Sequence, residues 1–120
     1  MSDIRAGTIS DAAGTGPITL TGQSAAKAWV NFNGSGTVAI RDSLNVGSIT
    51  DSGTGEYFVN FFNNFSNVNY SATVGSGAGG VTYYPPSNYN SSSLKQVTRA
   101  SDGTVYDSTI ISLNAHGDLA

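Results

Sequence analysis

Apolar and polar side chains alternate along most of the chain with a period of two, which is the pattern of β-strands that bury one face. In the most regular run, Ala28, Val30 and Phe32 fall on one face, and Trp29 lies on the other face with two asparagines. The run 56–62 carries large apolar side chains on both faces. Such a strand predicts either a central position in a sheet or contact with another subunit.

Turn signals separate these runs at short, regular intervals. Asn33-Gly34 is a strong hairpin signal, and glycine-rich turns follow at 51–55 and 101–103. The pattern gives about eight strands spaced roughly 8–12 residues apart and no helix, which is typical of an antiparallel sandwich. The sequence therefore predicts an all-β fold with a single antiparallel β-sandwich or jelly-roll-like domain.

Three local features of this fold are predicted as well. We expect residues 41–43 to interrupt the strand that begins at Thr37, and we expect residues 97–99 to form a final hairpin with 104–113. We also expect Trp29 to be substantially buried, because a lone tryptophan among alternating apolar residues usually anchors a core.

The first 23 residues lack the dense pattern of the rest. Their apolar residues are isolated, and a Gly-Thr-Gly-Pro turn interrupts them at 14–17. Two interpretations stay open: an edge strand of the domain, or an arm that lies on another protein. We predict an extended N-terminal segment at 1–23 and a β-sandwich domain at 24–120. The side chains that would attach such an arm are Ile4, Ile9, Ile18 and Leu20.

Composition suggests that the chain buries surface against copies of itself. Gly, Ser, Thr and Asn fill nearly half of the 120 residues, and Leu, Ile, Val and Phe fill only about a fifth. A chain of this length forms one domain with a modest core. The thin core and the run 56–62 together predict an oligomer. Its candidate interface residues are Phe58, Phe62 and Phe65.

Charge and residue usage exclude several classes of protein. The chain has no Cys and one His, so disulfides, thiol chemistry and multi-histidine metal sites are ruled out. Five basic against eight acidic residues, with a net charge of −3, argue against binding of nucleic acid. No apolar run approaches the roughly 18 residues of a membrane span, so we expect no membrane insertion. We expect no metal or other cofactor.

Catalytic chemistry is hard to assemble from these residues. A serine nucleophile needs a base, and only His116, near the C-terminus, offers one. A glycosidase needs two facing carboxylates, but Glu56 is the only glutamate and most aspartates lie in turns, where they bond nearby amides. We therefore predict no catalytic residues and no enzyme, and a polysaccharide hydrolase is only a remote alternative.

One segment has the composition of a binding loop. Residues 83–90 hold three tyrosines, stiffened by two prolines and surrounded by Ser and Asn. Tyrosine rings stack on the apolar faces of sugars or peptides while their hydroxyls bond polar groups. Tyr83, Tyr84 and Tyr89 are therefore candidate contacts to a ligand such as a surface glycan. The alternative is that the rings cap the core or pack on a neighbouring subunit.

A long ordered string runs from Ala25 to Phe61. It contains KAWVNFNG from Lys27, ITD from Ile49, GTG from Gly53 and VNF from Val59. This string closely resembles a module of tail-fibre and fibre-like virion proteins of bacteriophages, especially marine and cyanobacterial phages. The resemblance implies a structural role in the virion and a homotrimer, and it brings no catalytic residues. Where the family has a polar stretch after VNF, residues 62–67 carry two extra aromatics, which suggests a contact surface.

Two functions of different classes follow from these observations. The first is a non-enzymatic virion protein, displayed as a trimer on a tail fibre or fibre tip for adhesion to the host. The second is a capsid decoration (cement or head-fibre) protein that stabilises the shell. The resemblance and the tyrosine loop favour adhesion, and the lack of a shaft-like repeat favours decoration. An adhesive tyrosine loop should lie exposed, at the end farthest from the N-terminal segment. Both functions place the chain in the virion, in contact with other tail or capsid proteins.

Overall fold

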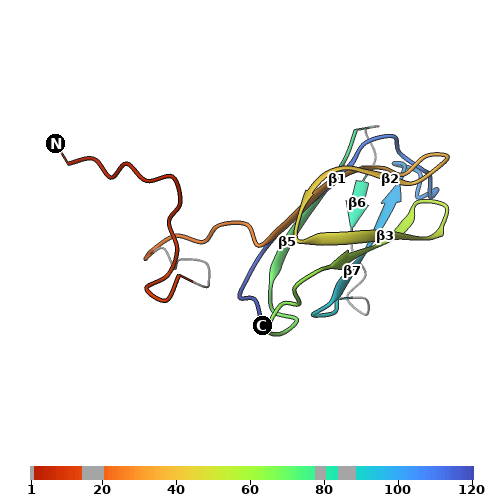
Figure 1. The fold of residues 1–120 in the computed structure, drawn as a ribbon. Coiled ribbons are helices and arrows are strands. Elements are labelled where there is room, and N and C mark those ends of the chain that lie inside the picture. Colours follow the sequence, from red (N-terminus) through yellow and green to blue (C-terminus); the bar gives the residue numbers. More distant parts are fainter. Residues whose placement is uncertain (1, 15–20, 78–80, 84–88) are drawn as a thin grey trace.

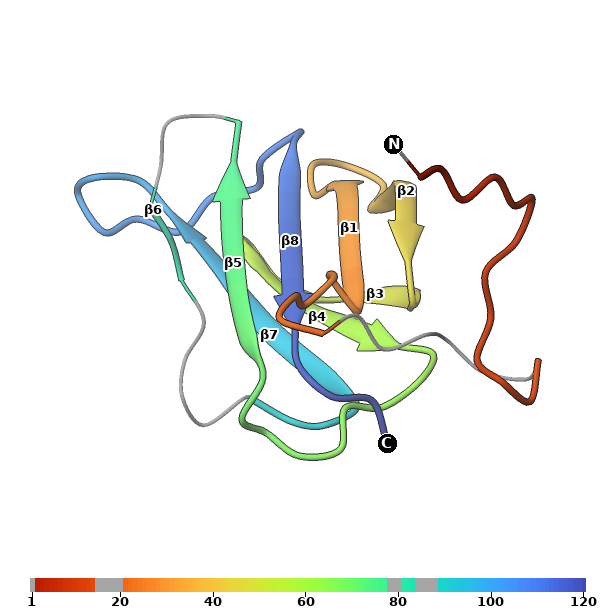
Figure 2. The ribbon, with the colours of Figure 1, turned by 90° about the vertical axis from the view of Figure 1, so that its left-hand side faces the viewer.

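The computed structural model describes residues 2–14, 21–77, 81–83 and 89–120. These residues form eight β-strands and no helix, arranged in two sheets (Figures 1 and 2). The strands are β1 (Ala28–Asn33), β2 (Ala39–Leu44), β3 (Val46–Gly53), β4 (Glu56–Phe61), β5 (Ser71–Ser76), β6 (Val81–Tyr83), β7 (Ser93–Arg99) and β8 (Ile111–His116). The all-β sandwich that the alternation predicts is therefore confirmed.

Each sheet contains four antiparallel strands. The first sheet has the order β2-β1-β8-β5 and the second the order β3-β4-β7-β6. Figure 2 shows the first sheet in front, with β4 and β7 crossing behind it. This order places β2 and β3 at one side of the sandwich and β5 and β6 at the other. We name the end where β1 begins and β8 ends the arm end; the β1–β2 and β3–β4 turns lie at the opposite, far end.

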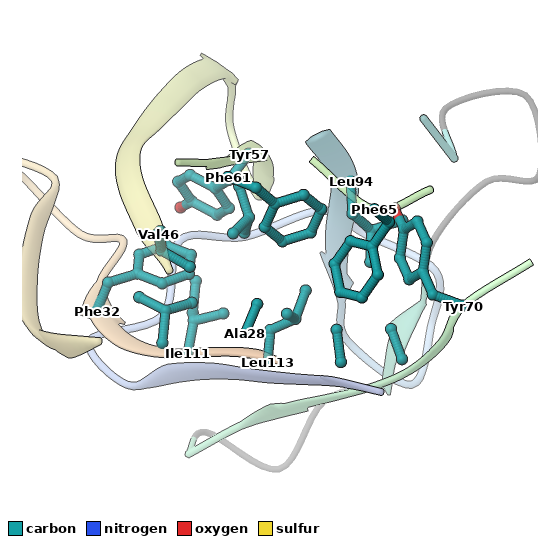
Figure 3. Close-up of a cluster of buried hydrophobic side chains, with 14 residues drawn as sticks. Ala28, Phe32, Val46, Tyr57, Phe61, Phe65, Tyr70, Leu94, Ile111 and Leu113 are labelled. Carbon is teal, nitrogen blue, oxygen red and sulfur yellow. The ribbon is translucent and has the colours of Figure 1, made fainter. Parts of the chain in front are cut away.

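The core lies between the sheets and consists of the inward faces of their strands (Figure 3). Phe32 and Tyr57 meet edge to face across the two sheets, with ring centroids 5.3 Å apart. At the arm end, Phe61, Phe65 and Tyr70 form a second aromatic group. Such pairs contribute about 0.5–1.5 kcal/mol beyond the area that they bury. The buried core residues are Ala28, Val30, Phe32, Val46, Tyr57, Val59, Phe61, Phe65, Tyr70, Ala72, Leu94, Ile111, Leu113 and Ala115.

Asn45 turns the chain from the first sheet to the second. It lies between β2 and β3 with a φ of 56°, in the left-handed region that asparagine tolerates better than most residues. Its Nδ2 donates to the Asn63 carbonyl oxygen at 3.0 Å, and its Oδ1 accepts from the Asn63 amide at 2.7 Å. The Asn45 carbonyl oxygen also accepts from the Phe62 amide at 3.2 Å. These bonds fix the corner where β2 passes into β3.

The predicted break at residues 41–43 is wrong, because β2 continues through them. The register between β1 and β2 shifts between Asn31 and Phe32, so β2 accommodates an extra residue as a β-bulge. The Arg41 guanidinium reaches across the sheet, donating to Asn31 Oδ1 at 3.3 Å and to the Thr109 carbonyl oxygen at 2.6 Å. A bulge, rather than the end of a strand, accommodates this polar run.

The predicted final hairpin is correct only near its turn. Arg99 and Val105 form an antiparallel bridge on either side of residues 101–103. The chain then crosses to the first sheet, where β8 lies between β1 and β5. Ser108 marks the crossing: it is buried, and its hydroxyl donates to the Ile110 carbonyl oxygen at 2.9 Å. The strand β8 therefore pairs with β1 and β5 in the first sheet and not with β7. Its apolar side chains point into the core.

Trp29 is partly buried, but the prediction that it anchors the core is wrong. Its neighbours Ala28 and Val30 are buried in the core, so Trp29 lies on the outer face of the first sheet, where it is only partly buried. Its register partners on the two adjacent strands are Leu44 and Asn114. The period of two along β1 outweighs the general preference of tryptophan for the core.

Candidate attachment and contact surfaces

We name the segment before β1 the arm, and its described residues lie outside the two sheets (Figure 1). None of its described residues, 2–14 and 21–27, belongs to a strand. Ile4 is 89% exposed and Ile9 is 62% exposed, so the sandwich covers neither side chain. The other two predicted attachment residues lie outside the described residues; they are Ile18 and Leu20.

The root of the arm is hydrogen-bonded to the sandwich. The Lys27 amide donates to the Ala115 carbonyl oxygen at 2.8 Å, which holds the root beside β8. Farther out, Arg5 and Asp3 form an exposed ion pair at 3.7 Å, of a kind that contributes little to stability. The arm is therefore positioned at the arm end but does not contribute a described residue to the core.

One side of the sandwich is a long strand edge. Among the described residues, β2 pairs only with β1 and β3 only with β4, so the outer edges of both strands are free. Two aliphatic side chains of β2 are exposed, Ile40 at 36% and Leu44 at 48%. Phe62, just after β4, is 75% exposed. Its ring lies against Gly47: a Cβ atom added to Gly47 would be 3.2 Å from the nearest ring atom of Phe62. Leu44 and Phe62 thus lie on either side of Asn45, at the arm-end corner of this edge.

The three predicted interface residues differ in exposure. Phe62 is open to solvent and remains a candidate. Phe58, on the outer face of the second sheet, is partly buried, and the Lys95 Nζ lies 5.7 Å from the centroid of its ring. The prediction for Phe65 is wrong: it is 2% exposed and its ring stacks on Tyr70 at 4.2 Å. A side chain inside the core of one subunit has no surface left for another subunit.

Tyr89 is a packing residue rather than a free binding residue. Its ring stacks on Tyr70 with centroids 4.4 Å apart, and its hydroxyl donates to the Tyr70 carbonyl oxygen at 2.8 Å. The Tyr70 hydroxyl donates in turn to the Asn90 carbonyl oxygen at 2.8 Å. Burial, and then the proximity of Tyr89, raise the pKa of the Tyr70 hydroxyl above its usual range. Tyr89 therefore caps the core, which was the alternative interpretation of its ring.

The position of Tyr89 does not match the one expected of an adhesive residue. Tyr70 immediately precedes Ser71, whose register partner is His116 at the end of β8, so Tyr89 lies at the arm end. Tyr83 is the last residue of β6, where the description covers the backbone alone, and Tyr84 lies outside the described residues.

A hydrogen-bond network that the sequence does not reveal holds the far end together. The Tyr57 hydroxyl lies 2.7 Å from the Gly34 carbonyl oxygen and 2.7 Å from Asp107 Oδ1. The same Asp107 oxygen accepts from the Gly55 amide at 2.7 Å. Burial, and then the hydrogen bond to Asp107, raise the pKa of the Tyr57 hydroxyl above its usual range. One buried phenol thus joins both far-end turns to the segment that leads into β8.

Two groups that the sequence analysis considered for chemistry can be placed in the described ranges. In the ranges that the structure describes, no group of three His, Cys, Asp or Glu side chains is placed to hold a metal ion. His116, the one candidate base, is exposed at the end of β8 opposite Ser71. No described helix is long and apolar enough to cross a membrane.

Comparison with protein-family models, with curated proteins and with solved structures gives no match. A functional proposal for this chain therefore draws on its own sequence and geometry. Its most distinctive features are the exposed arm, the free β2–β3 edge with its apolar corner, and the polar turns of the far end.

Proposed function

We propose that the chain is a non-enzymatic structural protein of the bacteriophage virion, attached by its arm and displaying the β-sandwich at the particle surface. The observation that carries this proposal is the arm, on which Ile4 and Ile9 are exposed outside both sheets. An extended segment adds backbone hydrogen bonds to a strand edge of a partner while its side chains fill pockets. Full burial of each isoleucine by such a partner contributes about 1.5–3 kcal/mol.

The sandwich is suited to display because none of the described arm residues belongs to its core. Among the described residues, Ala28 is the first in the core, and the other buried core residues lie after it. The resemblance of residues 25–61 to tail-fibre modules supports placement in a virion. Together these features favour a domain that is carried by its N-terminal segment.

In the leading form of the proposal, the chain forms a homotrimer on a tail fibre or fibre tip and contributes to adhesion to the host. The far end, opposite the arm, supports this role, because its turns expose small polar side chains that suit hydrogen bonds to glycan hydroxyls. These exposed residues are Thr37, Ser52, Thr54, Ser101, Asp102 and Thr104.

One observation favours a second function, decoration of the capsid. Because Tyr89 packs on Tyr70 at the arm end, one of the three tyrosines on which adhesion depended is not free for a ligand. The arm serves a decoration protein equally well, since it would then lie on neighbouring capsid subunits and reinforce their contact.

Deletion of residues 2–16 tests the attachment role. The truncated chain should unfold at the same urea concentration as the full chain, because no described core residue is removed, and it should no longer enter particles. The matched control is full-length Ile110→Ser, which alters an exposed far-end isoleucine and should enter particles normally. Normal incorporation of the truncated chain would contradict attachment by the arm, and its unfolding would make the segment part of the fold.

The two forms of the proposal differ in the response to Tyr83→Ser with Tyr84→Ser. Tyr89 is left intact in this variant because its replacement would disturb the core. If the chain is an adhesin whose binding uses the tyrosine loop, particles that carry the variant should adsorb poorly to host cells and keep their resistance to heat. If the chain decorates the capsid, adsorption should be normal and any defect should appear as lower heat resistance. Tyr89→Phe, which keeps the stacked ring, is the control.

A further inference from the structure

Asn33 and Gly34 form a pair with a chemistry of its own. Asn33 is the one asparagine of the sequence that directly precedes a glycine. An asparagine in this position is prone to deamidation, because a following residue without a Cβ leaves its backbone nitrogen open to attack the asparagine side chain. The pair lies where β1 ends and the β1–β2 turn begins, at the far end of the sandwich (Figure 2).

Packing requires the glycine of this pair. A Cβ added to Gly34 would be 2.6 Å from Ile111 Cδ1 and 2.6 Å from the Tyr57 hydroxyl oxygen. Both of these neighbours are fully buried core residues, so they cannot move aside to make room for a side chain. Position 34 therefore excludes the larger residues that would hinder deamidation of Asn33.

The turn requires the asparagine. Its Nδ2 donates to the carbonyl oxygens of Ser35 and Thr37, at 2.7 Å and 3.1 Å, and its Oδ1 accepts from the Ser35 amide at 3.2 Å. One side-chain amide thus bonds three backbone groups of the turn, which a side chain without both a donor and an acceptor could not do. A chemically labile pair is therefore built into this turn.

The folded chain blocks deamidation at both of the atoms that must react. The nucleophile would be the Gly34 nitrogen, but its proton is donated to the Ser108 carbonyl oxygen at 2.9 Å. The electrophile would be the Asn33 Cγ, but the three bonds to the turn hold the side-chain amide. The Tyr57 hydroxyl, 2.7 Å from the Gly34 carbonyl oxygen, fixes the next peptide group as well. The reaction therefore needs the turn to open first.

We propose that Asn33 is a deamidation site that is sealed while the far end is closed and reacts when the β1–β2 turn opens. In the open turn, the Gly34 nitrogen forms a bond to Asn33 Cγ, and the bond from Cγ to Nδ2 breaks. The proton of the Gly34 nitrogen leaves with the side-chain nitrogen as ammonia. Water then adds to the cyclic imide and opens it at either carbonyl, which gives aspartate or isoaspartate at position 33.

Either product weakens the closed turn. Aspartate places a carboxylate oxygen, in place of the Nδ2 donor, against the carbonyl oxygens of Ser35 and Thr37, and both of these acceptors lose their partner. Isoaspartate adds a methylene group to the backbone just before Gly34, where Ile111 and Tyr57 leave no room for another atom. An opening that is otherwise reversible therefore becomes permanent.

Peptide mass spectrometry of the full-length chain measures the seal. The chain is kept at mildly alkaline pH, below the range in which tyrosines ionise, once in buffer and once in guanidinium chloride that unfolds it. Deamidation at Asn33 should be slower in buffer by on the order of a hundred-fold, because only the open fraction reacts. Equal rates in the two solutions would overturn the inference.

Asp102→Asn provides a control within the same molecule, because it places a second asparagine before a glycine. The Gly103 amide also donates to a carbonyl oxygen, that of Ala100 at 2.9 Å, but a Cβ added to Gly103 would meet nothing within 4 Å. In buffer, position 102 of this variant should deamidate several-fold faster than Asn33, and in guanidinium chloride the two positions should react at similar rates. Equal rates in buffer would show that packing around Gly34 gives no protection, which overturns the inference.

Two tyrosine variants locate the seal. Tyr57→Phe removes the hydroxyl beside the Gly34 carbonyl oxygen, and Tyr70→Phe removes a hydroxyl that bonds the Asn90 carbonyl oxygen at the arm end. Deamidation of Asn33 in buffer should be several-fold faster in Tyr57→Phe and much less affected in Tyr70→Phe. Equal acceleration in both would show that the reaction follows unfolding of the whole sandwich, which overturns the role of the far-end turn.

The modified chain tests the consequence of the reaction. After return to native buffer and separation by its added negative charge, it should unfold at a lower guanidinium concentration than the unmodified chain. Asn33→Asp supplies the aspartate product without the added backbone atom, and the isoaspartate form should be less stable than this variant. A modified chain that regains the original unfolding midpoint would overturn the permanent effect. None of these measurements involves a particle, so their outcome is independent of the proposed function.

Discussion

The ring of Tyr89 stacks on the ring of Tyr70 with centroids 4.4 Å apart, and the Tyr89 hydroxyl donates to the Tyr70 carbonyl oxygen at 2.8 Å. Tyr70 itself stacks on Phe65, so the three rings form one continuous group at the arm end (Figure 3 shows Phe65 and Tyr70). This group makes the end of the tyrosine-rich segment part of the core. The same segment in isolation has the composition of a binding loop.

Replacement of Tyr89 measures its contribution to the core. Tyr89→Ser should lower the free energy of unfolding by about 2–4 kcal/mol, because it removes a stacked ring, its buried area and a hydrogen bond. Tyr89→Phe keeps the ring and should cost only about 1 kcal/mol. Urea unfolding measures both losses. Equal, negligible losses in the two variants would show that Tyr89 is free in solution.

Trp29 should contribute much less to stability than a core aromatic residue of the same strand. Because Trp29 is partly exposed on the outer face of β1, Trp29→Ala should lower the free energy of unfolding by about 1–2 kcal/mol, whereas Phe32→Ala should lower it by about 3–5 kcal/mol. The same urea titration compares the two variants. A loss for Trp29→Ala as large as that for Phe32→Ala would contradict this assignment.

Gly55 should tolerate substitution poorly for a steric reason. Its φ is 69°, and a Cβ there would stand 2.7 Å from the Thr98 carbonyl oxygen and 2.8 Å from the Tyr106 carbonyl oxygen. Gly36 has a similar φ of 66° but nothing within 4 Å of an added Cβ, so it serves as the matched control. Gly55→Ala should therefore be more destabilising than Gly36→Ala by about 1–3 kcal/mol. Equal losses of stability in the two variants would mean that the positive φ alone, and not the steric contact at Gly55, sets the cost of the substitution.

Stability should fall in alkaline solution because of Tyr57 and Tyr70. Burial is the main cause that raises the pKa of both hydroxyls above the usual value of about 10. The unfolded chain loses these protons first, so the stability is fully present below about pH 10 and falls as the pH rises above it. The slope approaches about 2.7 kcal/mol per pH unit for the two groups together.

Urea unfolding at several values between about pH 8 and pH 11 measures this slope. Tyr57→Phe should reduce it by about half, since it removes one of the two groups. A free energy of unfolding that does not change with pH across this interval would contradict the buried state of the two hydroxyls.

Local pattern was sufficient to predict the all-β fold and the inward faces of two central strands, β1 and β4. The alternation in β1 and β4 correctly assigned Phe32, Tyr57 and Val59 to the inward faces, because a strand with one buried face repeats every two residues. The same rule assigns Trp29 to the outer face, and the expectation that Trp29 anchors the core failed because it rested on the general preference of tryptophan instead of on this rule.

Contacts between distant residues could not be predicted in this way. Tyr57 and Asp107 meet although 50 residues separate them, and no local pattern links a core tyrosine to an aspartate in a loop. Gln96 and Thr98 are both fully buried, although polar residues on a strand ordinarily indicate an exposed face. Phe65 was predicted to be a contact residue because the sequence around it does not indicate that the ring of Tyr70 stacks on it.

The central claim is that this chain is a surface protein of the virion attached by its arm, and cryo-electron microscopy of the particles that carry it tests this claim most directly. The account predicts density for the sandwich on the outside of the particle, on a tail fibre or on the capsid, with the arm end toward the particle and the far end toward solvent. Particles assembled with the chain lacking residues 2–16 should lose this density. Density that persists without the arm, or a sandwich whose far end faces the particle, would contradict the account.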